Sequence, residues 1–447
     1  MSKTKVALVG AGSTSFGVNT LADLFNQRDL LRGSTIALCD AKPERLGRVA
    51  RLAERMNAAT GAAFQIECGT DLRAVLPGTE FVLVAAEADR LERWKLDWEI
   101  PNRHGIKHVL GENGGPGGLA HALRTIDLVL GIAREVERLA PDAYLINYTN
   151  PLSRVCLALT RYTGLKVVGM CHQINKGYYI VGHVLGLTPR LSESASIDRV
   201  ADEMRARFDL KTAGLNHLTW ITDLREAGTG RDLYPEFRAR LADFDPGFEP
   251  LSRRLYITFG LYPTSGDGHL GEYFAYAHET SELKGYDFDG REAEAAALDA
   301  QVERAGNRDD ALNEFLRWES GERGVHVAAA VLNNLNRYEL AVNVVNNGAL
   351  PGLPDWAIVE LPAVVGGQGI MPLRMEPLPA GITAALNQQV AVQDRVVEAA
   401  VHGDRQAALQ ALLLDPLITS YSTAEQLLDE LLAAHAAYLP AFAGKQK

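Results

Sequence analysis

The sequence has few cysteines and no long apolar run. Its four cysteines in 447 residues are scattered and show no CxxC spacing, which argues against a disulfide framework and against a zinc finger. No apolar stretch approaches the ~18 residues that a membrane span requires. No secretory signal is visible either, because the apolar run near the N-terminus continues straight into glycine-rich sequence. We therefore expect a cytoplasmic protein with no membrane partner.

Positive charge is also scarce. The formal net charge is −11, so nucleic-acid binding is not expected as a main purpose. Hydrophobic residues make up 47% and charged residues 23% of the chain, as is ordinary for a soluble globular protein. A chain of this length can form two domains with a sizeable core.

Short β-branched runs alternate with helical patterns over roughly the first 185 residues. Helical periodicity is clearest at 43–59 and 123–140. The alternation predicts a parallel sheet with helices on its faces. The glycine-rich segment 111–118 is predicted to be a loop. Strands are predicted at 5–10, 35–40, 64–68, 80–86, 143–149 and 166–171.

The pattern changes after about residue 190. Residues 208–228 alternate like strands of an antiparallel sheet, and helical periods return at 326–335 and from 380 to 437. We therefore predict an α/β fold with two domains. Residues 1–190 would form a Rossmann-like NAD-binding domain. Residues 191–447 would form an α+β domain that carries substrate and metal residues and the contacts between subunits.

The segment KVALVGAGSTSFG (5–17) has the composition of a nucleotide-binding turn. Gly10 permits a tight turn after the first strand, and Gly12 lacks the Cβ that would obstruct a phosphate. A helix predicted from about Thr14 would point its free N–H groups at a pyrophosphate. Position 15 is Ser, so the third glycine of GxGxxG is missing and the motif alone is weak. The alternative is an α/β protein whose glycine turn binds nothing.

Asp40 strengthens the prediction of a dinucleotide site. It ends the second predicted strand, where a carboxylate can accept hydrogen bonds from both ribose hydroxyls of NAD. A 2′-phosphate would be repelled there, although Lys42 leaves some room for NADP. Ser13 and Phe16 complete the predicted cofactor-binding set, together with Asp40 and the two glycines of the turn.

Cys171 and His172 follow the sixth predicted strand, at the sheet edge where ligands of open α/β sheets bind. A thiolate and an imidazole can hold a divalent transition metal. A buried cysteine beside an incidental histidine is the simpler interpretation of this pair alone. His217, which we place within a strand in GLNHLTW, is a second possible ligand from the other domain. Two protein ligands leave coordination positions open for substrate and water, as a catalytic metal requires.

These motifs and several others occur in the order found in glycoside hydrolase family 4, whose members depend on NAD and a divalent metal. The chain resembles that family nearly from end to end, and the resemblance implies the overall plan of lactate and malate dehydrogenases. The segments that carry it are GAGSTSFG, GENGGPGGLAHALRTI, NYTNPLSRVCLALT, MCHQ, GLNHLTW, YPTSGDGHLGEY and NNGALPGLPDWAIVELPAVVGGQGIMPL.

The resemblance implies hydrolysis by an unusual route that differs from two-carboxylate catalysis. NAD would take a hydride from C3 of the sugar, and the metal, expected to be Mn²⁺, would polarise the resulting carbonyl. A base would then remove the C2 proton, the glycosidic oxygen would leave, water would add, and NADH would return the hydride. The substrate would be a small glycoside, and the enzyme a homodimer or homotetramer.

The resemblance also assigns roles to individual residues. Cys171 and His217 would bind the metal. Asn150, Asn113 and His172 would bind the sugar, and His172 would belong to the catalytic set. A Cys-His pair accompanies α-linked, unphosphorylated sugars in the family.

The resemblance leaves alternatives open for the sugar and for the base. Gln173 matches none of the familiar versions of the Cys-His motif, so an anionic sugar, either a uronide or a sulfonated sugar, stays open. The predicted base is Asp267 in GDGH. The alternative is Tyr262, whose pKa of about 10 would have to be lowered.

Two other classes of function stay open at this point. An NAD-dependent hydroxy-acid dehydrogenase would share the Rossmann start, but it gives no reason for pairing Cys171 with His217. A catalytically idle NAD-binding sensor would bind the cofactor and ignore both Mn²⁺ and glycosides.

Overall fold

The computed structural model describes residues 3–13, 16–191, 196–280, 286–318 and 320–444. The strands among these residues form one sheet in the order β3-β2-β1-β4-β5-β6-β9-β10-β7-β8, and β11 pairs with β10. The first six strands are parallel and match the predicted ones. They are β1 (Lys5–Val9), β2 (Thr35–Cys39), β3 (Gln65–Gly69), β4 (Phe81–Val84), β5 (Tyr144–Asn147) and β6 (Lys166–Gly169).

Burial follows the position of each strand in the sheet. The central strand β4 is apolar and buried throughout, and β1 is apolar and buried from Val6 onward, whereas the edge strand β3 is mostly exposed. Continuous apolar strands are typical of a parallel sheet covered on both faces.

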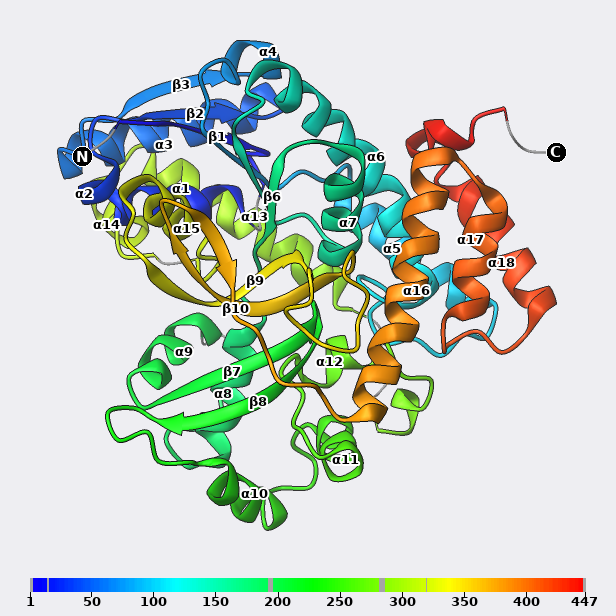
Figure 1. The fold of residues 1–447 in the computed structure, drawn as a ribbon. Helices are drawn as coiled ribbons and strands as arrows, with labels where there is room; N and C mark the ends of the chain where they lie inside the picture. Colours follow the sequence, from blue (N-terminus) through cyan, green and yellow to red (C-terminus); the bar gives the residue numbers. More distant parts are fainter. Residues whose placement is uncertain (1–2, 14–15, 192–195, 281–285, 319, 445–447) are drawn as a thin grey trace.

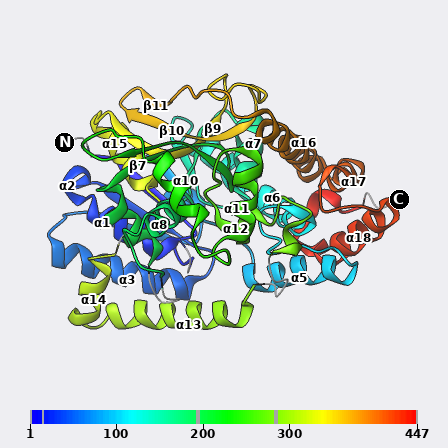
Figure 2. The same ribbon diagram turned by 90° about the horizontal axis from the view of Figure 1, so that it is seen from below.

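Helices cover both faces of the parallel part (Figures 1 and 2). One face is buried under α6 (Gly115–Leu139), α7 (Leu152–Tyr162), α16 (Ala380–His402), α17 (Arg405–Leu414) and α18 (Tyr421–Ala434). The other face is buried under α1 (Gly17–Asn26), α3 (Pro43–Thr60) and α15 (Gly324–Asn333). Figure 2 shows α13 (Phe288–Ala305) running beside α3, with α14 (Asp309–Phe315) next to it.

The sheet continues without a break into the second half of the chain. β6 pairs with β9 (Arg337–Val345), and β10 (Ile358–Gly366) joins β9 to β7 (Phe208–Leu215). The antiparallel hairpin of β7 and β8 (Leu218–Glu226) confirms the strands predicted within 208–228. The domain boundary near residue 190 stays a prediction.

The helices α8 to α12 pack around this hairpin in the lower part of Figure 1. They are α8 (Ile174–Val184), α9 (Ile197–Arg205), α10 (Tyr234–Ala242), α11 (Pro250–Phe259) and α12 (Gly266–Leu270). The remaining elements are α2 (Arg28–Leu31), α4 (Leu72–Val75), α5 (Arg90–Arg103), β11 (Gly369–Pro372) and the 3-10 turns Ala277–Glu279, Ala436–Tyr438 and Pro440–Phe442.

The predicted loop at 111–118 is wrong in its second half, because α6 begins at Gly115. The glycines there permit close packing rather than flexibility. A Cβ at Gly117 would lie 2.6 Å from the carbonyl oxygen of Gly111, and one at Gly118 would lie 2.7 Å from the carbonyl carbon of Asn113. Pro116 suits the first turn of a helix, where its missing N–H has no partner to lose.

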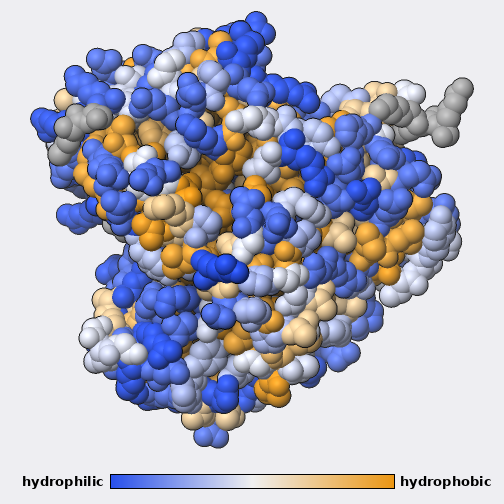
Figure 3. Space-filling model, in the orientation of Figure 1, coloured by the Kyte–Doolittle hydropathy of each residue, from blue (hydrophilic) through white to orange (hydrophobic). Residues whose placement is uncertain are grey.

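Polar side chains cover most of the face shown in Figure 3, with apolar side chains gathered near its centre. Among the described residues, no helix combines the length and the apolar character needed to cross a membrane.

Candidate active site

The glycine turn after β1 requires both of its predicted glycines. Gly10 has a φ of +84°, and a Cβ there would collide with the carbonyl oxygen of Ala85. The N–H of Gly12 donates to Asp40 Oδ2 at 2.8 Å, and a Cβ at Gly12 would lie 2.9 Å from the same oxygen. The other carboxylate oxygen of Asp40 accepts from the N–H of Lys42 at 2.8 Å. Asp40 therefore holds the turn in shape, and its contact with a ribose stays a prediction.

The third glycine of the turn is Gly17, which the sequence analysis missed because it expected that glycine at position 15. Gly17 is the first residue of α1, and a Cβ there would collide with the carbonyl oxygen of Ala11. It thus allows the close packing of helix on strand that the third glycine of a Rossmann turn provides. Thr14, the predicted helix start, lies outside the described residues.

The two other predicted cofactor residues flank this turn. The N–H of Ser13 donates to the carbonyl of Gly10 at 2.9 Å. The ring of Phe16 stacks on that of Tyr148, with 6.0 Å between the centroids. Tyr148 directly follows β5, so the contact between the two rings packs the glycine turn against the carboxyl edge of the sheet.

Cys171 and His217 lie side by side although 46 residues separate them in the chain. The distance from Cys171 Sγ to His217 Nε2 is 3.6 Å. Two ligands of one tetrahedral cation, at about 2.3 Å for sulfur and about 2.1 Å for nitrogen, would be about 3.6 Å apart. His217 occupies the turn between β7 and β8 rather than a strand, which corrects the sequence prediction. A turn suits a ligand, because its side chain can leave the sheet surface.

Electrostatics also suit a bound cation. Burial raises the pKa of the Cys171 thiol, and the carboxylates of Glu322 and Glu360 raise it further. Burial lowers the pKa of His217, as do the charges of His269 and His172. The imidazole is therefore neutral and able to donate its lone pair, while the thiolate would need a positive charge beside it. The residues present fit a divalent transition metal.

The protein supplies only part of a coordination shell here. No set of three or more His, Cys, Asp and Glu side chains comes together as a metal site within the described part of the chain. Open positions of this kind are what a catalytic metal needs in order to accept substrate oxygens.

A second cluster lies at the carboxyl ends of β4 and β5. Asn150 Nδ2 donates to Glu112 Oε1 at 3.3 Å, and Arg90 binds the same carboxylate. Asn113, the other predicted sugar ligand, is 4% exposed, and its Oδ1 has no hydrogen-bonding partner in the described part of the chain. Burial alone would raise the pKa of Glu112, but the charges of Arg90, His269 and His121 together outweigh burial and lower that pKa.

Glu272 connects this cluster to the predicted metal ligands. Its Oε2 accepts the backbone N–H groups of Glu112 at 2.7 Å, Asn113 at 2.6 Å and Gly114 at 3.1 Å. Its Oε1 lies 2.9 Å from His269 Nδ1, and the ring of His269 stacks on that of His217 with 4.5 Å between centroids. His269 is thus brought beside the predicted metal ligands in a fixed orientation.

Comparison with known proteins identifies the family. Residues 5–185 match the description "Family 4 glycosyl hydrolase", and residues 212–418 match its C-terminal domain. An α-glucosidase of Erwinia rhapontici is 32% identical over 98% of this chain and 99% of its own. The chain belongs to family 4 of the glycosyl hydrolases. It is therefore a glycoside hydrolase.

Other members of the family and more distant folds are also similar to this hydrolase. An α-galacturonidase of Bacillus subtilis is 28% identical over 97% of each chain. A 6-phospho-α-glucosidase from gut microorganisms, solved with NAD and Mn²⁺, has a TM-score of 0.83 at 22% identity, covering 98% of this chain and 99% of that one. A malate dehydrogenase of Plasmodium falciparum has a TM-score of 0.51 at 13% identity, covering 92% and 99%. The predicted dehydrogenase-like plan is confirmed.

The two predicted bases of the hydrolase lie elsewhere. Asp267 Oδ1 accepts from the N–H and the hydroxyl of Ser252, and its Oδ2 accepts from the N–H of Leu251, so the carboxylate caps the N-terminus of α11. Burial raises the pKa of Asp267, as does Glu249.

Tyr262 is wholly buried against the rings of Phe237 and Tyr256. Burial raises its pKa, which is the opposite of what a base needs. The assignment of the base to Asp267 or Tyr262 stays a prediction. His269 and Glu272, which belong to the same segment, were not among the predicted site residues.

His172, predicted to bind sugar, faces two carboxylates. Its Nδ1 lies 3.3 Å from Asp198 Oδ1 and 3.6 Å from Glu322 Oε1. Burial lowers the pKa of His172, but the Glu322 and Asp198 carboxylates outweigh it and raise that pKa.

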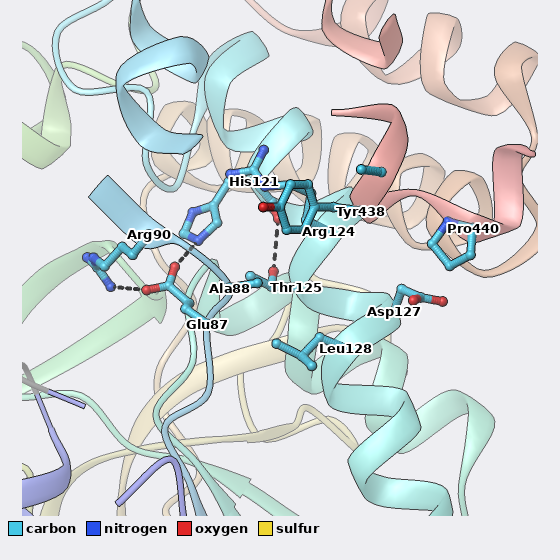
Figure 4. A pocket seen from close by; sticks show the side chains of 11 residues that line it. Glu87, Ala88, Arg90, His121, Arg124, Thr125, Asp127, Leu128, Tyr438 and Pro440 are labelled. Atoms are coloured by element: carbon cyan, nitrogen blue, oxygen red, sulfur yellow. Dashed lines mark hydrogen bonds and ion pairs between the residues drawn. The ribbon is translucent and has the colours of Figure 1, made fainter. Parts of the chain in front are cut away.

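A cavity of about 210 Å³ lies beyond Arg90 on the side of the C-terminal helices (Figure 4). Arg90 and His121 both bind Glu87 at its wall, and Tyr438 faces it from the C-terminal segment. Cys171 and His217 are not among its lining residues, so it adjoins the hydrolase site without containing it.

Proposed function

We propose that this glycosyl hydrolase cleaves α-linked, unphosphorylated glycosides with NAD and a divalent metal, for which Mn²⁺ is the first candidate. The separation of Cys171 and His217 carries the proposal, because it equals that of two ligands of one cation. The glycine turn supports NAD, and the similar 6-phospho-α-glucosidase was solved with both NAD and Mn²⁺.

The absent groups would supply hydride transfer at C3 and polarisation of the sugar oxygens. The chain's own residues would orient the sugar and move its protons. Asn150 and Asn113 are placed to hold hydroxyl groups, since both lie at the carboxyl edge of the sheet beside Glu112.

We propose His269 as the group that takes the C2 proton, in place of Asp267. Its Nδ1 is held by Glu272, which leaves Nε2 for the substrate. A carboxylate behind an imidazole fixes its orientation and stabilises the imidazolium that forms. Glu272 is itself held by three backbone N–H groups, so this orientation is firmly set.

The function is tested with nitrophenyl α-glycosides. Hydrolysis is expected to need both added NAD and Mn²⁺, to accumulate no net NADH, and to place deuterium at C2 of the released sugar when run in D₂O. Accumulating NADH would instead favour a hydroxy-acid dehydrogenase, and indifference to Mn²⁺ and to every glycoside would favour a sensor. A product with only protium at C2 would contradict proton removal there.

The base is tested by comparing His269→Gln with Asp267→Asn. His269→Gln is expected to lower kcat/KM by about 10²-fold or more, the usual contribution of a general base. Asp267→Asn should mainly lower the melting temperature, because it weakens the cap of α11 by about 1 kcal/mol. A larger activity loss in Asp267→Asn at unchanged stability would restore the original assignment.

The pH profile gives a second readout of His269. Burial lowers its pKa, but Glu272 outweighs burial and raises it above 6.5. Because the base must be deprotonated, kcat/KM should rise with pH through this raised pKa. Glu272→Gln should move that rise to lower pH, which a purely structural Glu272 would not do.

A further inference from the structure

Glu322 is a buried carboxylate without a hydrogen-bonding partner. The residue is 2% exposed, and neither side-chain oxygen has a hydrogen-bonding partner among the described residues; its one close charged neighbour is His172, at ion-pair distance. Buried polar groups are almost always hydrogen-bonded, and leaving a charged one unsatisfied is expensive. Such a group is expected where a ligand completes its contacts.

Backbone hydrogen bonds on the side facing α1 hold Glu322 in place. Its N–H donates to the hydroxyl of Ser320 at 3.0 Å, and the N–H of Ser320 donates to Asp23 of α1 at 3.1 Å. On its other side, Glu322 Oε1 lies 3.6 Å from Nδ1 of His172, whose side chain is 44% exposed. The carboxylate therefore lies beside the residue that follows Cys171, where the site opens to solvent.

Charges around Glu322 make this part of the site acidic. Asp198 Oδ1 lies 3.3 Å from the same nitrogen of His172, so two carboxylates face one imidazole. The cations on neighbouring described segments already have carboxylate partners: Arg323 binds Glu339, Arg205 binds Asp202, and Lys176 binds Glu249. His172 offers at most one positive charge against two negative ones.

We propose that Glu322, with Asp198 beside it, selects uncharged sugars by accepting hydrogen bonds from hydroxyl groups of the glycone and repelling a carboxylate or sulfonate placed there. This inference rests on the proposed glycosidase function and decides between its neutral and anionic substrates. Like charges brought close in a partly buried site repel strongly. Hydroxyl groups of a neutral sugar can donate the hydrogen bonds that the Glu322 carboxylate lacks, and they bring no negative charge.

The test is Glu322→Gln, which keeps the shape and one acceptor oxygen but removes the charge. On nitrophenyl α-glucoside and α-galactoside, kcat/KM is expected to fall about 10- to 100-fold, mostly through KM. The preference for these over the matching nitrophenyl α-uronides should shrink at least about tenfold. The affinities for NAD and Mn²⁺, measured by calorimetry, should stay unchanged.

Thermal melting separates a functional from a structural role. Glu322→Gln removes the ion pair with His172 but also removes a buried charge that has no hydrogen-bonding partner among the described residues, so it is expected to keep or raise the melting temperature. Glu314→Gln is the matched control, since Glu314 is an exposed carboxylate on the preceding helix α14, and it should change neither activity nor preference.

Three outcomes would overturn the inference. In each of them the preference of Glu322→Gln for neutral sugars is unchanged. It is unchanged with no other effect, or it is unchanged while NAD binding weakens, which would show that Glu322 serves the cofactor, or it is unchanged while the melting temperature falls. If the wild type cleaves no glycoside, the proposed function fails instead. Calorimetry with free galactose and galacturonate then tests Glu322 directly: equal effects of the substitution on both sugars overturn its role, and selective loss of galactose binding supports it.

Discussion

Cys171→Ser is expected to lower kcat/KM by about 10³-fold or more. The metal's polarisation of substrate oxygens contributes several kcal/mol to catalysis, and each 1.36 kcal/mol is about tenfold in rate. A serine hydroxyl is a poor substitute for the thiolate that lies 3.6 Å from His217 Nε2. The measurement is hydrolysis of a nitrophenyl α-glycoside with saturating NAD over a series of Mn²⁺ concentrations.

The same variant should bind Mn²⁺ more weakly in a direct titration, which does not depend on turnover. Cys68→Ser is the matched control, because Cys68 is exposed and lies on the edge strand β3. It should leave both activity and metal affinity unchanged. Full activity of Cys171→Ser in the presence of EDTA would remove the metal role altogether.

Asp97→Asn should lower the free energy of unfolding by about 3–5 kcal/mol, the usual cost of breaking a buried ion pair. Asp97 of α5 is wholly buried and accepts from both guanidinium nitrogens of Arg124 on α6, at 2.8 and 2.6 Å. His435, just beyond α18, lies 2.8 Å from the same carboxylate. The substitution would leave Arg124 as a buried cation without a partner and would loosen the C-terminal helices. Denaturant unfolding measures the change.

A double substitution sharpens this prediction. Replacing both partners, as in Asp97→Leu with Arg124→Met, should recover much of the loss, since no charge is then left unpaired. Asp142→Asn, at an exposed position, should change stability by no more than about 0.5 kcal/mol. A loss below about 1 kcal/mol in Asp97→Asn would show that the pair does not stabilise the fold.

The sheet explains how distant residues reach one site. Cys171 follows β6 and His217 follows β7, and the two strands are separated in the sheet by β9 and β10. Asn343 of β9 and Asn216 beside His217 both donate to Glu360 Oε2 of β10, each at 2.8 Å. Glu360 thus fixes the spacing of the two segments that carry the predicted metal ligands. A change at this carboxylate would act on the site through position rather than through direct contact with substrate.

Local patterns in the sequence predicted the first six strands and the tight glycine turn after β1 correctly. Strand alternation, helical periodicity and glycine spacing act within a few residues, so they can be recognised without tertiary contacts. The same reasoning failed at 111–118 and at His217, where a helix start and a turn depend on packing against other segments.

Only the tertiary structure decided which side chains of the segment 267–272 lie next to His217. Asp267, His269 and Glu272 are neighbours in the sequence, and composition gives no reason to prefer one over another. The capping of α11 takes the carboxylate of Asp267, while three N–H groups of residues 112–114 hold Glu272 and so direct His269 toward His217. These partners lie 15 to 160 residues away in the chain. The direction of a side chain in a loop is set by such long-range hydrogen bonds, which no local pattern encodes.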